Sequence, residues 1–125
     1  MARNSITTTA IALPVGPFSP AVRAGEFLYL SGQVAQDPTT GQLTEGDVTA
    51  QTEQIFRNLA AVLGAAGKSF ADVIRVGVFL IDMQDYPAMN LVYTRHFDAP
   101  YPARTAVAVA ALPLGAAVEI DLVAR

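Results

Sequence analysis

The chain has 125 residues, of which 52% are hydrophobic and 15% are charged, and its formal net charge is −3. This length predicts a single domain over residues 1–125, and the apolar content excludes an intrinsically disordered chain. Eight basic residues against eleven acidic ones form no positive stripe for phosphates, which argues against nucleic acid as a main partner. The apolar excess predicts burial against further subunits.

No apolar run reaches the roughly 20 residues that span a bilayer, so we expect no membrane association. Residues 1–16 contain no apolar stretch typical of a secretory signal. Cysteine is absent, which excludes disulfides, thiolate metal sites and a cysteine nucleophile. We therefore expect a cytoplasmic protein.

The first third of the chain predicts a loop, two strands and a turn. Three prolines predict that residues 13–20 form a stiff, extended loop. Residues 22–34 predict two short strands around a turn at Ala24-Gly25, the second running over 27–31. The DPTTG segment at 37–41 predicts another turn.

Residues 47–66 predict a long helix. Their apolar side chains recur at helical spacing and form one stripe. Thr44 and Asp47 are candidate N-caps, and Gly67 is typical of a helix C-terminus.

A strand and a second helix follow. Residues 73–81 are apolar at both alternating sets of positions, which favours a strand inside the sheet. Asp85 is a candidate cap for a helix whose apolar side chains recur from Met89 to Phe97. The APYP segment at 99–102 predicts its end.

Residues 105–111 and 117–124 flank an LPLG turn and predict a terminal hairpin. The order β-β-α-β-α-β-β then predicts an α+β two-layer sandwich, with both helices on one face of a mixed sheet. In such a hairpin, Arg104 and Glu119 lie about six residues apart along the ladder, or roughly 20 Å. We therefore expect the two to meet only across a subunit interface.

Arg104 opens the apolar strand predicted at 105–111, and Glu119 interrupts the apolar strand predicted at 117–124. Charges in such strands need a partner or a function. Arg104 is either a surface residue paired with Asp98 or Glu119, or a functional group, and the pattern alone leaves both open. His96 is predicted to be a packed or partly exposed structural histidine rather than a catalytic one. No metal-ligand spacing or nucleotide-binding loop is present, so we expect neither a metal nor another cofactor.

Two segments resemble a known family. PARTAVAVAALPLGAAVEIDLVA at 102–124 resembles the signature segment of the RidA/YjgF family, the reactive intermediate deaminases once labelled L-PSP endoribonucleases or translation-initiation inhibitors. VGPFSPAVRAGEFLYLSGQVAQDPTTGQL at 15–43 is similar to the family's N-terminal GPYS, SGQ and PxTG motifs, and the region around Asn90 also matches. The resemblance covers nearly the whole chain.

The resemblance implies a homotrimer of chorismate-mutase-like subunits. Three clefts between the subunits would hydrolyse enamines and imines of 2-keto acids, such as 2-aminoacrylate and the 2-imino acids derived from it, without a cofactor. Arg104 takes the place of the arginine that binds the substrate carboxylate, and Glu119 that of the glutamate that activates water. The implied substrate-binding positions, with Arg104, are Phe18, Ser31, Gly32, Asn90 and Ala106.

Two of these positions depart from the family pattern. Phe18 stands where the family has a tyrosine and lacks its hydroxyl, and Ala106 stands where the family has a cysteine.

The chemistry agrees with the resemblance. A planar guanidinium binds a carboxylate with two parallel hydrogen bonds, which suits Arg104. A single carboxylate with a raised pKa can serve both proton transfers of imine hydrolysis, and Glu119 is the candidate.

Two other functions stay open. A non-catalytic protein could bind small 2-keto or 2-imino carboxylates through Arg104 without turnover. An endoribonuclease would need paired acid and base groups and cations for the phosphates, which this acidic chain with one lysine does not offer.

Overall fold

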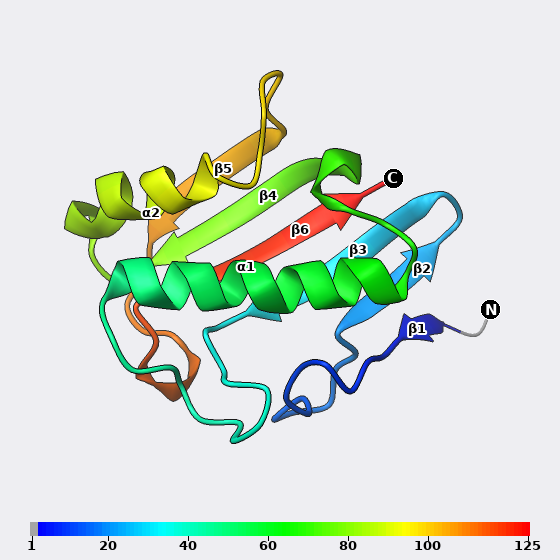
Figure 1. The fold of residues 1–125 in the computed structure, drawn as a ribbon, viewed down its shortest axis with the longest axis horizontal. Coiled ribbons are helices and arrows are strands. Elements are labelled where there is room, and N and C mark those ends of the chain that lie inside the picture. The colour runs from blue at the N-terminus through cyan, green and yellow to red at the C-terminus, as the bar shows by residue number, and fades with distance from the viewer. Residues whose placement is uncertain (1–2) are drawn as a thin grey trace.

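The computed structural model describes residues 3–125. It contains one six-stranded sheet in the order β1-β2-β3-β6-β4-β5, with two helices packed on it (Figure 1). The strands are β1 (Asn4–Ile6), β2 (Ala21–Ala24), β3 (Phe27–Gln33), β4 (Val73–Leu80), β5 (Ala103–Ala108) and β6 (Val118–Ala124), and the helices are α1 (Val48–Ala65) and α2 (Tyr86–Tyr93). Short 3₁₀ turns occupy Phe70–Asp72, Met83–Asp85 and Pro113–Gly115.

Helix α1 forms as predicted. The Asp47 carboxylate accepts a hydrogen bond from the Ala50 N–H at 3.1 Å, which satisfies one free donor of the first turn. Gly67 follows the helix with φ +74°, a left-handed conformation that glycine adopts without strain. The buried stripe of α1 then packs on the sheet and is centred on Ile55, Phe56 and Leu59.

Helix α2 ends earlier than predicted, at Tyr93. The next residues form a tighter turn in which the Arg95 and His96 N–H groups bond to carbonyls three residues back. The prediction of a packed His96 is confirmed, since its ring stacks on Phe56 with centroids 4.3 Å apart.

The predicted terminal hairpin is wrong. β5 pairs with β4 in parallel, while β6 pairs with both β3 and β4 in antiparallel fashion. Helix α2 returns the chain to the end of the sheet at which β4 begins, so β5 runs parallel to β4 and forms the edge strand. The linking segment 109–117 then crosses β4 and inserts β6 at the centre, where more of its surface is buried. The hairpin register that related Arg104 to Glu119 therefore does not exist.

Strand β1 was not predicted. It has three residues, pairs only with β2 at the sheet edge and is largely exposed. Its sequence, NSI, carries too little hydrophobic pattern to signal a strand.

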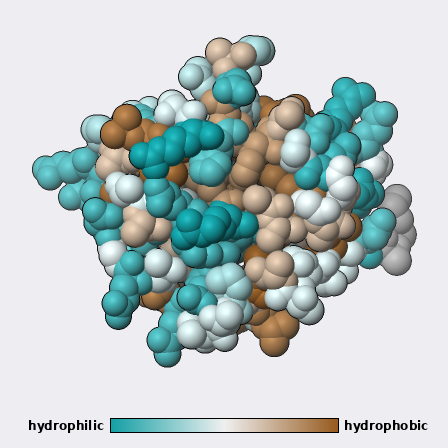
Figure 2. All heavy atoms as spheres, in the orientation of Figure 1, coloured by the Kyte–Doolittle hydropathy of each residue, from teal (hydrophilic) through white to brown (hydrophobic). Residues whose placement is uncertain are grey.

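The fold otherwise has the predicted two layers. Both helices lie on one face of the sheet (Figure 1), and the core lies between them and the strands. Figure 2 shows hydrophilic side chains over much of this helix-covered side. Within residues 3–125 the opposite face carries no helix, and Tyr29 and Val107 on it are 50% and 40% exposed. The sheet therefore has a covered face and an open face.

Candidate active site

The predicted site residues lie in two groups on opposite faces of the sheet. Arg104 pairs with Val76 of β4, which is fully buried under the helices. Glu119 pairs with Phe79, three residues further along β4. Residues an odd number apart on a strand point to opposite faces, so Arg104 points to the covered face and Glu119 to the open face.

The two side chains do not meet within one chain. Arg104 and Glu119 are separated by two strand spacings and about three residues, which puts their Cα atoms roughly 14 Å apart. Within residues 3–125, Arg104 forms no ion pair with Asp98, Glu119 or any other carboxylate. The interpretation of Arg104 as one half of a surface pair is therefore wrong.

The first group, here named the arginine pocket, is built by α2 and β5. The guanidinium of Arg104 donates one hydrogen bond to Asn90 Oδ1 and one to Tyr86 Oη, both at 2.9 Å. Its Cζ lies 4.6 Å from the centroid of the Tyr93 ring, within range of a cation–π interaction. The pocket is lined by Asn90, Tyr93, Thr94, Tyr101, Pro102 and Arg104.

Helix geometry brings these partners together. Tyr86, Asn90 and Tyr93 occupy positions i, i+4 and i+7 of the α2 region and therefore share one face. Asn90 is among the positions that the family resemblance implies, but the two tyrosines were not predicted as partners of Arg104. Their spacing relative to Asn90 was the signal that could have found them.

In the part of the chain that the structure describes, the hydrogen-bond partners of Arg104 are uncharged. Its charge is held in place without being neutralised, and each terminal nitrogen keeps one N–H for another acceptor. Burial raises the pKa of the Tyr93 hydroxyl, against the opposing charge of Arg104, so Tyr93 also stays neutral. The arrangement suits a small anion with two oxygen atoms.

Ala106 lies two residues after Arg104 on the covered face, where its side chain packs against the core. The Val109 N–H bonds to the Leu80 carbonyl of β4. Because backbone groups alternate sides along a parallel strand, the N–H and C=O of Ala106 point to the free edge of β5. Ala106 can therefore offer backbone groups to a ligand but no polar side chain.

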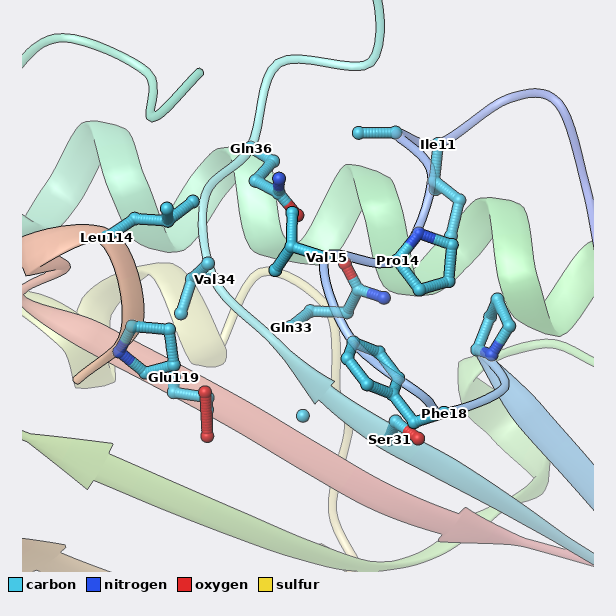
Figure 3. A pocket seen from close by; sticks show the side chains of 14 residues that line it. Ile11, Pro14, Val15, Phe18, Ser31, Gln33, Val34, Gln36, Leu114 and Glu119 are labelled. Atoms are coloured by element: carbon cyan, nitrogen blue, oxygen red, sulfur yellow. The ribbon is translucent and has the colours of Figure 1, made fainter. Parts of the chain in front are cut away.

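The second group, here named the glutamate pocket, lies beside β3 and β6. Its volume is about 220 Å³, which suits a ligand of few heavy atoms. Figure 3 shows Phe18 and Ser31 on one side of it and Glu119 and Leu114 on the other. The Ser31 Oγ donates to the Ser19 carbonyl at 2.7 Å, which fastens the loop that carries Phe18.

Gly32 is required by the position of Glu119. A Cβ on residue 32 would lie 2.8 Å from Oε2 of Glu119 and 2.9 Å from its Cδ, closer than side-chain atoms normally approach. Burial raises the pKa of Glu119, and the nearby charge of Asp121 raises it further. A carboxyl of this kind is suited to accept and return a proton.

Other kinds of site find little support in residues 3–125. No three His, Asp or Glu side chains among them gather as metal ligands. None of the helices in this part of the chain is long and apolar enough to cross a membrane.

Comparisons with known proteins identify the family of the chain. The family model described as Endoribonuclease L-PSP matches residues 7–125. A RutC family protein of Pyrococcus horikoshii is 47% identical, over 98% of this chain and 97% of that protein. The 2-iminobutanoate/2-iminopropanoate deaminase of Mus musculus is 43% identical, over 98% of this chain and 90% of that protein. The crystal structure of RidA from the Antarctic bacterium Psychrobacter has a TM-score of 0.94 and 44% identity, over 98% of this chain and 99% of that one. The chain therefore belongs to the RidA/YjgF family and has its chorismate-mutase-like fold.

Proposed function

We propose that this protein is a cofactor-independent deaminase that hydrolyses small 2-imino acids to 2-oxo acids and ammonia. We further propose that it acts as a cytoplasmic homotrimer, in clefts that join the arginine pocket of one subunit to the glutamate pocket of the next. The similarity to the mouse deaminase supports the reaction class.

One observation carries the proposal. Arg104 and Glu119 are charged side chains without an ion-pair partner in residues 3–125, and they point to opposite faces of one sheet. A ligand with a carboxylate next to a C=N carbon needs both groups within a few ångströms. Two copies of the chain can supply both, because β5 is a free edge and one sheet face is open.

The reaction follows from these groups. Arg104 would bind the substrate carboxylate through its two free terminal N–H groups. Glu119 would take a proton from water as the water oxygen bonds to the imine carbon, and would return a proton to the nitrogen. Glu119 would then take the hydroxyl proton of the resulting carbinolamine and pass it to the nitrogen. The C–N bond breaks, ammonia leaves, and the carbon becomes the carbonyl of the 2-oxo acid.

A non-catalytic binder is the second candidate. It is favoured by Phe18, which lies in the glutamate pocket at 47% exposure and offers no hydroxyl to a substrate. Release of ammonia from freshly generated 2-iminopropanoate separates the two, since a binder would leave the uncatalysed rate unchanged.

We predict that Arg104→Ala abolishes catalysed ammonia release while the protein stays folded. Arg104→Lys should also be severely impaired, since one ammonium cannot make the two-pronged contact of a guanidinium. Circular dichroism and thermal unfolding provide the folding control. Near-normal turnover by Arg104→Ala would exclude the proposed role of Arg104.

A further inference from the structure

We propose that Tyr86 is a positioning residue that fixes the guanidinium of Arg104 for the substrate carboxylate. This inference rests on the proposed function. It concerns a residue at the start of α2 that is not among the residues implied by the family resemblance.

The geometry around Arg104 leaves few ways for the guanidinium to turn. Asn90 Oδ1 holds one terminal nitrogen and Tyr86 Oη holds the other, each at 2.9 Å. The Tyr93 ring lies under the guanidinium plane, with its centroid 4.6 Å from Cζ. Without the Tyr86 hydroxyl, the Asn90 hydrogen bond and the Tyr93 ring would remain to oppose rotation about the Nε–Cζ bond, and the second hydrogen bond would be lost.

The choice of a phenol also has an electrostatic consequence. A carboxylate at this position would hold Arg104 more strongly but would neutralise it and compete with the substrate anion. A phenol oxygen accepts the hydrogen bond and, unlike a carboxylate, brings no negative charge with it. Tyr86 therefore orients the cation and leaves its charge available.

Tyr86→Phe tests this role because it removes one oxygen atom and keeps the ring. We expect the KM for the imino acid and the dissociation constant for 2-oxobutanoate each to rise about tenfold, the scale of one hydrogen bond to a charged group. The value of kcat should stay within about twofold, because Glu119 and the water are untouched.

Tyr29→Phe is the matched control. It removes the same hydroxyl from a half-exposed tyrosine of β3 that lines neither pocket. With native mass spectrometry showing an unchanged assembly, it should change neither constant. If the role of Tyr86 were purely structural, Tyr86→Phe would instead lower the melting temperature and kcat together.

A second readout is independent of turnover. Nitrogen-15 NMR of the Arg104 side chain should show faster rotation about Nε–Cζ in Tyr86→Phe than in the wild type. Unchanged rotation in Tyr86→Phe would overturn the inference. If the wild type binds 2-oxobutanoate, an unchanged affinity of Tyr86→Phe for this ligand would overturn it as well. A wild type that neither releases ammonia nor binds 2-oxobutanoate would refute the proposed function, and the NMR measurement would still decide the role of Tyr86.

Discussion

The surroundings of the charged group differ between the arginine pocket and the glutamate pocket. Arg104 lies among neutral hydrogen-bond acceptors and an aromatic ring, which stabilise the ion without cancelling its charge. Glu119 lies over Gly32 with Asp121 nearby, where burial and a like charge disfavour its ionised form. One pocket therefore keeps a permanent cation available, and the other keeps a carboxyl ready to exchange a proton.

The contrast shows that each pocket is chemically incomplete. A pocket with only the cation can hold an anion but cannot activate water, and a pocket with only the carboxyl can move a proton but cannot orient a substrate. Because the two pockets lie on opposite faces of one sheet, their combination depends on how copies of the chain pack.

Mixing two inactive variants would test this dependence most strongly. Arg104→Ala and Glu119→Ala should each be inactive alone, but subunit exchange at equal amounts should restore about a quarter of wild-type activity. The fraction follows because each cleft would draw Arg104 from one subunit and Glu119 from the next, each intact in half of the subunits. Ammonia release measures activity, and native mass spectrometry confirms mixed trimers. Mixed trimers without activity would contradict the shared cleft.

Asn90→Asp would remove the electrostatic contrast. The new carboxylate keeps the acceptor of Arg104 but neutralises its charge, so 2-oxobutanoate affinity should fall by about tenfold or more. Asn90→Ala removes the acceptor without adding charge and should weaken binding less. Calorimetric titration measures the affinity of both variants for 2-oxobutanoate. Equal losses of affinity would show that the charge of Arg104 does not matter.

Gly32→Ala would disturb only the glutamate pocket. The new Cβ would displace the carboxylate of Glu119, and a misplaced catalytic group costs about 10- to 100-fold in rate. Gly77→Ala is the matched variant, because its Cβ would instead displace the carboxylate of Asp121. We expect kcat/KM to fall more in Gly32→Ala than in Gly77→Ala, and the reverse order would argue against Glu119 as the proton carrier.

The smallest expected effect is on the pH dependence of stability. Burial lowers the pKa of His96, as does the charge of Arg95, against the opposing charge of Glu53. The fold therefore favours the neutral ring, and the unfolding free energy should fall as the pH drops from about 6.5 through the lowered pKa. Glu119 and Asp121, with raised pKa values, oppose this trend. Urea unfolding measures this free energy at each pH, and in His96→Phe it should not show the decrease that the wild type shows on acidification.

The predictable parts of the fold were local. Helix α1 could be located because its stripe, its cap at Asp47 and its stop at Gly67 all lie within one segment. The position of β6 could not, since pairing with β3 and β4 depends on contacts far apart in sequence. Two apolar strands separated by a short turn look like a hairpin whether or not a third strand separates them.

The candidate site was predictable to the same extent. Arg104 and Glu119 stood out because each places a charge in an apolar strand. Tyr86 was not singled out and Tyr93 was assigned to the packed stripe, because their contact with Arg104 depends on β5 lying beside α2. The opposite directions of the two charges also depend on β4, which lies between their strands.

The central position of β6 has a consequence for how the sheet assembles. β1, β2 and β3 form one piece, β4 and β5 form another, and β6 alone bridges the two. Until β6 docks, β3 and β4 each expose an unpaired edge, which is a template for pairing with other chains. Because β6 follows the other five strands of residues 3–125 in sequence, β3 and β4 can be joined only after all of those strands have been made. Folding therefore depends on contacts distant in sequence, which favours slow formation of the complete sheet.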